Sequence, residues 1–270
     1  MGIYLSHGTP LKTARAYFTM PPQIHYCLAA GPGVADLMAY ELNTKREKVV
    51  PLGYPRNDIL TQPPQPVKDM LGTACKKVIV WYPTFRQHKN GMTTGSAKAL
   101  PVIHDEQVAS QLNDWAVEMD VLLVLKPHFA QDVSVIKDLN LSNIRFIDDD
   151  FFKQHNTTSY GFVAGCDALI TDYSSIYYDF LLCDKPVGLV WEDLEEYRTN
   201  PGFAVDLDEY CAGGVKIYTL DDFKAFVRQV ANQEDPCREA RHRVRDMTNY
   251  MPNGQNAKRV AAFIIEKANL

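Results

Sequence analysis

The 270-residue sequence lacks a long apolar run and a secretion signal. No stretch approaches the roughly 20 apolar residues that span a bilayer. Residues 1–7 contain no basic region, and their apolar core is too short for a signal peptide. We therefore expect a cytoplasmic protein.

Paired cysteines and an excess of positive charge are also missing. The six cysteines are scattered and form no Cys-x-x-Cys pair, which argues against a zinc site or a disulfide framework. The net charge of −5 gives no general attraction to nucleic acid or anionic lipid. We predict no nucleic-acid partner, no metal and no cofactor. A polyanionic ligand would have to be held by local basic groups and backbone amides.

The most informative stretch runs from Cys166 to Asp179. Residues 168–170 are apolar and typical of a strand buried on both faces of a parallel sheet. Ser174 or Ser175 then stands where a helix N-cap is expected, beside the free N–H groups of the first turn. A strand, a hydroxyl-rich turn and a helix start together suit an anion such as phosphate. An ordinary capped helix is an equally good interpretation of this stretch by itself.

Strand and helix patterns alternate from residue 76 onward, which predicts a doubly wound parallel α/β sheet. The expected strands are 78–82, 121–125, 143–147, 168–170 and 186–190. The expected helices include 108–119 and three at the C-terminus, 224–233, 236–247 and 257–267. The last helices carry a basic segment that either approaches anionic lipid or, as we favour, is a solvated helix face. Its residues are Arg238, Arg241, Arg243 and Arg245.

Polar residues follow three of the expected strands. They are Pro83-Thr84-Phe85-Arg86, Lys126-Pro127-His128 and Thr171-Asp172-Tyr173-Ser174-Ser175. Ligands of open parallel sheets lie at the carboxyl ends of the strands, so we expect these groups around one cleft that fits a pyrophosphate. Asp179, one helical turn after Ser175, could anchor a ribose, orient a basic neighbour or be a solvated helix carboxylate.

The N-terminal segment has its own short strand pattern. Residues 3–5 read as a strand that runs into a Gly- and Pro-flanked loop, which exposes His7 near Lys12. A lone histidine is more often structural, and we weigh this one with its neighbours. Residues 51–66 read as a proline-rich, irregular join between two units. Arg56 on that join either forks onto a phosphate or is a solvated surface arginine. The triple aspartate 148–150 favours a solvated turn over a metal site.

Six motifs follow one another along the chain. They are His7-Gly8-Thr9-Pro10-Leu11-Lys12, Gly53-Tyr54-Pro55-Arg56-Asn57-Asp58, Tyr82-Pro83-Thr84-Phe85-Arg86, Lys126-Pro127-His128, Thr171-Asp172-Tyr173-Ser174-Ser175 and Asp193-Leu194-Glu195-Glu196-Tyr197. In this order they resemble the CDP-glycerol glycerophosphotransferases, bacterial enzymes that polymerise or prime teichoic acids and related capsule polymers. The resemblance covers nearly the whole chain and implies a GT-B architecture of two facing Rossmann-like domains.

The resemblance also implies an activity and residue roles. An acceptor hydroxyl of a lipid-linked polymer attacks the β-phosphate of CDP-glycerol, or of CDP-ribitol, and CMP is released. His7 and His128 would be the catalytic residues. His7 would be the general base, and His128, with Arg56 and Arg86, would hold the pyrophosphate and offset the charge that develops on the leaving phosphate. The other implied substrate-binding residues are Gly8, Thr9, Lys12, Pro83, Thr84, Lys126, Ser174, Ser175 and Asp179, of which Pro83, Thr84 and Asp179 would line the nucleotide pocket.

One departure from the family pattern concerns the acceptor side. Family members carry a long segment before the His-Gly-Thr loop, whereas six residues precede His7 here. We therefore expect residues 1–50 to be a remnant, a truncated Rossmann-like portion, of an acceptor-side domain and residues 51–270 to form the CDP-donor domain. A misplaced start, a separate chain that supplies the other half, or a degraded relative would each explain this. The alternatives to an active transferase are a catalytically impaired CDP-alcohol-binding fragment and a GT-B glycosyltransferase using a nucleotide-sugar. The active protein would work peripherally at the inner face of the cell membrane.

Overall fold

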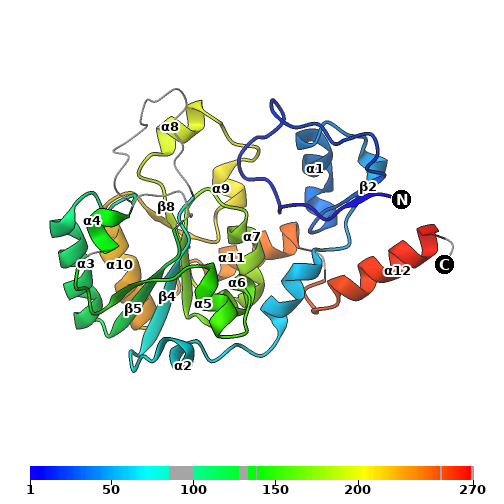
Figure 1. Ribbon diagram of the computed structural model, residues 1–270. Coiled ribbons are helices and arrows are strands. Elements are labelled where there is room, and N and C mark those ends of the chain that lie inside the picture. The colour runs from blue at the N-terminus through cyan, green and yellow to red at the C-terminus, as the bar shows by residue number, and fades with distance from the viewer. Residues whose placement is uncertain (85–99, 128–132, 138, 250, 269–270) are drawn as a thin grey trace.

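The computed structural model describes residues 1–84, 100–127, 133–137, 139–249 and 251–268. Within these residues the strands form two parallel sheets, a three-stranded sheet near the N-terminus and a six-stranded sheet in the rest of the chain (Figure 1). Helices pack against both sheets. The α/β class expected from the sequence is therefore confirmed.

The six-stranded sheet has the order β6-β5-β4-β7-β8-β9, and all its neighbours are parallel. Its strands are β4 (Lys77–Trp81), β5 (Val121–Leu125), β6 (Ile144–Phe146), β7 (Ala168–Thr171), β8 (Val187–Val190) and β9 (Val215–Ile217). The chain adds strands outward from β4 and then returns to place β7 on its other side. This is the doubly wound order of a Rossmann-like sheet, and the switch point lies between β4 and β7.

Helices cover both faces of this sheet (Figure 1). One face carries α3 (Glu106–Glu118), α4 (Ser134–Lys137) and α10 (Leu220–Ala231). The other carries α2 (Val67–Leu71), α5 (Asp149–Gln154), α6 (Ser159–Gly165), α7 (Ile176–Phe180), α9 (Leu207–Tyr210) and α11 (Arg238–Thr248). Successive residues of β4 alternate between the two cores: Ile79 packs on the first and Val80 on the second. Burial on both faces explains why the strands read as continuous apolar runs.

The N-terminal unit contains the three-stranded sheet. Its elements are β1 (Ile3–Tyr4), β2 (Tyr26–Leu28), η1 (Pro32–Val34), α1 (Ala35–Glu41), η2 (Arg46–Lys48) and β3 (Val49–Val50). Leu28 and Met38 belong to a core that is separate from the two cores of the larger sheet. The strand expected at residues 3–5 is confirmed as β1, whereas β3 was not predicted.

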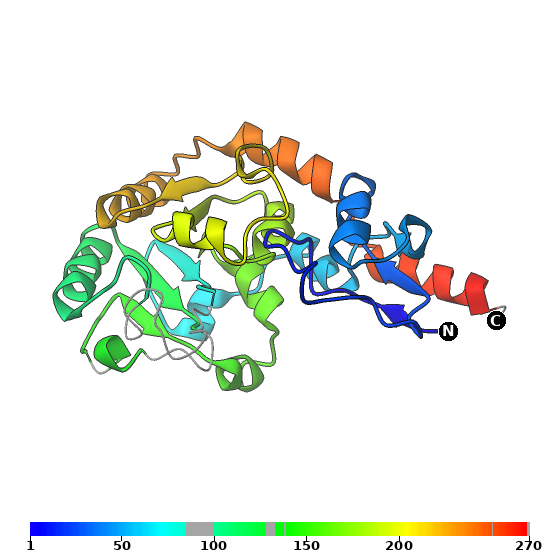
Figure 2. The same cartoon turned by 90° about the horizontal axis from the view of Figure 1, so that it is seen from above.

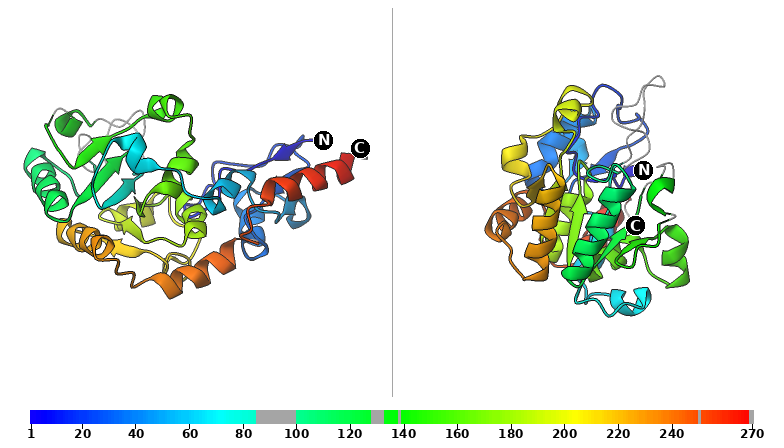
Figure 3. Two further views of the ribbon diagram at one scale, coloured as in Figure 1. Left: turned by 90° about the horizontal axis from the view of Figure 1, so that it is seen from below. Right: turned by 90° about the vertical axis from the view of Figure 1, so that its left-hand side faces the viewer.

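Two segments join the units. The first is η3 (Pro55–Thr61), a 3-10 helix, so the irregular join expected at residues 51–66 is wrong for this part of it. The second is C-terminal: α11 leads back toward the N-terminal unit, and α12 (Asn256–Ala268) packs on it (Figure 3). Val260 enters the N-terminal core, and the ring centroids of Phe263 and Tyr26 lie 5.0 Å apart. The three predicted C-terminal helices are confirmed.

The basic segment on α11 is not a uniformly solvated face. Arg241 is fully buried, and its guanidinium pairs with Asp184 at 2.9 Å and Asp235 at 2.6 Å. Arg238 also pairs with Asp184. The expectation of a solvated basic face is therefore wrong for Arg241, which ties α11 to η4 (Leu181–Cys183) and its C-terminal turn. In the described part of the chain, no helix is long and apolar enough to cross a bilayer.

Candidate active site

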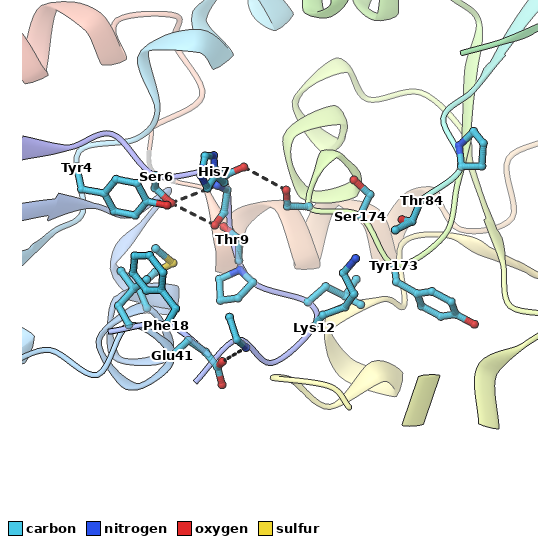
Figure 4. Close-up of a pocket in the computed structure, with 18 residues that line it drawn as sticks. Tyr4, Ser6, His7, Thr9, Lys12, Phe18, Glu41, Thr84, Tyr173 and Ser174 are labelled. Atoms are coloured by element: carbon cyan, nitrogen blue, oxygen red, sulfur yellow. Dashed lines mark hydrogen bonds between the residues drawn. The ribbon is translucent and has the colours of Figure 1, made fainter. Parts of the chain in front are cut away.

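A cavity of about 590 Å³ lies where the two units meet (Figure 4). From the N-terminal unit it is lined by the loop that follows β1, including His7 and Lys12. From the larger unit it is lined by Pro83 and Thr84 after β4, and by residues 173–175 after β7. These two loops flank the switch point, where a Rossmann-like sheet binds its ligands.

The His7 loop packs directly on Ser175. Gly8 has a φ of +135°, and a Cβ atom there would lie 2.5 Å from Ser175 Oγ. Only glycine combines this backbone conformation with so close an approach. Ser175 Oγ donates a hydrogen bond to the His7 carbonyl at 3.3 Å, and the His7 side chain is exposed in the cavity wall. The loop therefore holds the imidazole above the start of α7.

Asp172 joins the two loops of the switch point. This buried carboxylate accepts hydrogen bonds from the backbone N–H of Thr84 at 2.8 Å and of Tyr173 at 2.6 Å, and it also binds the Thr84 hydroxyl. Thr84 and Ser174 are thereby fixed on the same wall of the cavity. Asp172 belongs to a sequence motif, but the sequence pattern by itself predicted no role for it.

One of the two serines caps the helix start. α7 begins at Ile176 with Ser175 at the N-cap position, but the Ser175 side chain makes no cap hydrogen bond. Ser174 Oγ instead accepts a hydrogen bond from the Ile176 N–H at 3.5 Å. The predicted strand–turn–helix order is confirmed, and both serines line the cavity.

Asp179 lies beneath the cavity and is absent from its lining. It is fully buried and accepts hydrogen bonds from three side chains, Asn57 at 2.7 Å, Tyr160 at 2.6 Å and Arg56 at 3.1 Å. The predicted place in the nucleotide pocket is therefore not what the geometry shows, and neither is a solvated carboxylate. The geometry instead favours the remaining predicted role, in which Asp179 orients a basic neighbour.

That neighbour is Arg56, whose guanidinium links the two units. Its Nη1 donates to the Ser6 carbonyl at 2.9 Å, directly before His7, and its Nε donates to the Tyr160 hydroxyl at 3.0 Å. Burial by itself lowers the pKa of Arg56, but the Asp179 carboxylate and Tyr160 outweigh burial and hold that pKa above its ordinary value. The guanidinium therefore stays charged, and its Nη2 lies 3.1 Å from the position of a Cβ on Gly8.

The last sequence motif, residues 193–197, packs against Tyr173, which lines the cavity. The Tyr173 hydroxyl donates to Asp193 at 2.9 Å, and the Tyr173 ring stacks on Tyr197 of α8 (Leu194–Thr199) with centroids 3.9 Å apart. Lys12 Nζ lies 5.9 Å from the centroid of the same Tyr197 ring. The backbone around Lys12 pairs with the segment at Phe203, and Figure 2 shows the N-terminal loop reaching toward the larger unit.

Other predicted residues lie elsewhere. Lys126 follows β5 at the same sheet edge, but its Nζ pairs with Asp149 at 3.1 Å and does not line the cavity. Thr9, by contrast, belongs to the cavity lining, although it is fully buried. Arg86 and His128 lie outside the described residues.

The triple aspartate begins α5. Asp148 is its N-cap and accepts from the N–H groups of Asp150 and Phe151, while Asp150 pairs with Lys153. Each carboxylate thus has a different partner, and the expected turn is a helix start. Among the described residues, no group of three or more His, Cys, Asp or Glu is arranged to hold a metal ion.

Several cavity residues were not predicted. They are Tyr4, Phe18, Met38, Glu41 and Leu42, all in the N-terminal unit. Their sequence pattern is that of an ordinary core, because apolar spacing on a short helix does not distinguish a core face from a cavity wall.

Residues 2–266 match the family model of the CDP-Glycerol:Poly(glycerophosphate) glycerophosphotransferases. The chain belongs to this family. The match confirms the resemblance that the six motifs indicated.

Individual relatives agree with this assignment. The chain is 28% identical over 220 residues to the teichoic acid poly(glycerol phosphate) polymerase of Bacillus spizizenii, a match that covers 79% of this chain and 52% of that protein. It is 29% identical over 200 residues to the teichoic acid ribitol-phosphate polymerase TarK of Staphylococcus aureus, covering 70% of this chain and 35% of that protein. The chain thus spans about half of the first relative's length and about a third of the second's.

The fold has a solved counterpart. A structure of the wall teichoic acid polymerase TagF superposes with a TM-score of 0.70 at 18% identity and covers 97% of this chain and 67% of that chain. At this identity the likeness establishes the fold. The superposed region includes both units of the present chain.

Proposed function

We propose that the cavity between the two units transfers glycerol phosphate from CDP-glycerol to an acceptor hydroxyl and releases CMP. The observation that carries this proposal is that His7 lines the same cavity as Thr84, Ser174 and Ser175. A proton acceptor thus shares one cavity with hydroxyl groups at the switch point of a Rossmann-like sheet. The family assignment and the TagF structure soaked with CDPG support the choice of donor.

In the proposed reaction the acceptor oxygen attacks the β-phosphorus of CDP-glycerol. His7 takes the proton of the attacking hydroxyl, because histidine side chains exchange protons near neutral pH. As the new P–O bond forms, the bond from the β-phosphorus to the bridging oxygen breaks, and its electron pair leaves with CMP. The Ser174 hydroxyl donates a hydrogen bond to a phosphate oxygen, where charge develops, while the Thr84 and Ser175 hydroxyls donate to Asp172 and to the His7 carbonyl.

Basic residues offset the charge of the pyrophosphate in this scheme. Arg56 lies directly behind Gly8, and Lys12 lines the cavity. The roles in pyrophosphate binding that the resemblance gives to Arg86 and His128 belong to the same proposal. Lys126, which pairs with Asp149, acts from the margin of the site.

The acceptor we propose is a lipid-linked polymer of the teichoic acid or capsule type, and CDP-ribitol is the alternative donor. The names of the relatives, which include teichoic acid glycerol-phosphate and ribitol-phosphate polymerases, support a teichoic acid polymer as acceptor and a ribitol donor as the alternative. Such an acceptor requires peripheral association with the inner face of the cell membrane. The buried Arg241 excludes a fully exposed arginine face on α11 as the contact.

Titration calorimetry tests the donor. We expect the protein to bind CDP-glycerol and CMP more tightly than UDP-glucose, and Ser174→Ala to weaken the binding of CDP-glycerol about tenfold through the loss of hydrogen bonds to an ionised phosphate. Ser110→Ala, on the exposed face of α3, is the matched control and should leave binding unchanged. Tighter binding of UDP-glucose would contradict the proposal and favour a nucleotide-sugar transferase.

A further inference from the structure

The cavity has two ends of different chemistry (Figure 4). Thr84, Ser174 and Lys12 lie at the end that belongs to the sheet switch point. On the other side of His7 the wall is apolar and comes from the N-terminal unit. It is formed by Tyr4, Phe18, Met38 and Leu42.

The apolar end contains a platform of aromatic rings beside His7. The rings of Tyr4 and Phe18 are stacked with an interplanar angle of 26° and centroids 6.1 Å apart. The Tyr4 ring meets the His7 imidazole edge-on, with centroids 5.8 Å apart. A group that lies on this platform therefore reaches the imidazole from the side opposite the serines.

One buried carboxylate interrupts the apolar wall. Glu41, at the end of α1, is 3% exposed and lines the cavity. Its Oε2 accepts from the Thr13 hydroxyl at 2.9 Å and from the N–H groups of Ala14 at 2.7 Å and Arg15 at 3.2 Å. The second oxygen, Oε1, takes part in none of these three bonds. A carboxylate in such surroundings attracts a hydroxyl donor and repels an anion.

We propose that this end of the cavity is an acceptor subsite that selects an uncharged polyhydroxyl unit. The proposal rests on the proposed function and specifies its second substrate. The carbon face of the unit lies on Tyr4 and Phe18, one hydroxyl donates to Glu41, and another is presented to His7. The negative charge of Glu41 keeps a phosphate group out of this end, so any phosphodiester of the acceptor lies beyond the first unit.

The transfer step follows from this placement. The hydroxyl oxygen next to His7 bonds to the β-phosphorus, its proton passes to the imidazole, and the bridging P–O bond breaks toward CMP. Donor phosphates and acceptor hydroxyl thus approach from opposite ends of one cavity. The basic Lys12 at one end suits the donor phosphates, and the acidic Glu41 at the other end suits an uncharged acceptor.

Acceptor kinetics with glycerol and sn-glycerol 3-phosphate test the proposal. With the wild type, we expect kcat/KM for glycerol to exceed that for glycerol 3-phosphate. Glu41→Gln keeps an oxygen for the three hydrogen bonds but removes the charge, so it should shift this ratio about tenfold toward the phosphorylated acceptor. Glu47→Gln, an exposed substitution in the same unit, should leave the ratio unchanged.

The aromatic platform is tested separately. Phe18→Ala should raise KM for glycerol and leave the Kd for CDP-glycerol unaltered.

The outcomes separate this proposal from the proposed function. Wild-type protein that releases no CMP from CDP-glycerol even with a lipid-linked polymer as acceptor would refute the proposed function. Wild-type activity with a ratio that Glu41→Gln leaves unchanged would overturn the subsite and leave the function standing. Saturation-transfer NMR with glycerol and glycerol 3-phosphate gives a readout that needs no turnover. The subsite is supported if the wild type binds glycerol but not glycerol 3-phosphate, while Glu41→Gln binds both compounds. Equal binding of the two compounds by the wild type overturns it.

Discussion

At the scale of single residues, Asp179 shows how one buried side chain shapes the site without touching the cavity. Its carboxylate fixes Arg56, and Arg56 holds the Ser6 carbonyl that precedes His7. The His7 loop of one unit is therefore oriented by an aspartate of the other. This makes Asp179 a positioning residue.

The substitution Asp179→Asn should lower the free energy of unfolding by about 3 kcal/mol, because it leaves the Arg56 guanidinium without its buried countercharge. Urea denaturation measures this value. Asp36→Asn is the matched control: it also breaks an aspartate–arginine pair, but the Asp36 side chain is 89% exposed, so the loss should be below about 1 kcal/mol. Equal losses in the two variants would contradict the positioning role.

Gly8 offers a second test at the same scale. Gly8→Ala would bring a methyl group against Ser175, displace the loop and lower acceptor-dependent CMP release by on the order of 10²-fold, as expected for a small misplacement of a catalytic group. Gly72→Ala is the control, because Gly72 also has a positive φ but no atom lies within 4 Å of the position that a Cβ would take there. If the two variants kept similar rates, the close packing of the loop on Ser175 would be irrelevant to activity.

At the scale of elements, local patterns predicted well what local forces decide. The strands β5 and β7 and the amphipathic helix α3 were predicted, because burial and the spacing of apolar residues can be recognised in consecutive residues of the sequence. The contacts of Asp179 with Arg56 and of Glu41 with Thr13 were not predictable in this way, since the partners lie 123 and 28 residues apart. Such pairs depend on how the elements pack.

The contact between α11 and the turn after η4 also depends on how elements pack. Burial raises the pKa of Asp184, but hydrogen bonds from Arg241 and His242 outweigh it, so the pKa of Asp184 lies below its ordinary value. A lowered carboxyl pKa means that ionised Asp184 stabilises the folded state at pH values above the unfolded pKa of about 4. This stabilisation is lost as the pH falls through the folded pKa.

We therefore expect Asp184→Asn to reduce the free energy of unfolding at pH 7 and to have a smaller effect near pH 3, because the stabilisation by the ionised carboxylate declines once the pH falls below the unfolded pKa of about 4. Urea denaturation at both pH values measures the difference. Asp114→Asn, on the exposed surface of α3, should show no such change between the two pH values. A deficit of Asp184→Asn that stayed constant between pH 7 and pH 3 would rule out this electrostatic account.

At the scale of the whole molecule, the chain forms two Rossmann-like units that share one cavity. The C-terminal α12 returns to the N-terminal unit, so the first and last parts of the chain complete one core (Figures 1 and 3). The motif order predicted both units, but it did not show that residues of α1 form part of the cavity wall. The separation of polar and apolar ends arises only when the units are assembled.

The central claim is that this cavity performs transfer with His7 as the base. The direct measurement is CMP release from CDP-glycerol in the presence of a lipid-linked acceptor, for the wild type, His7→Ala and, as control, the exposed His25→Ala. We predict that His7→Ala binds CDP-glycerol as tightly as the wild type but releases CMP at least about 10²-fold more slowly, while His25→Ala is unimpaired. Release of CMP by His7→Ala at the wild-type rate would contradict the account.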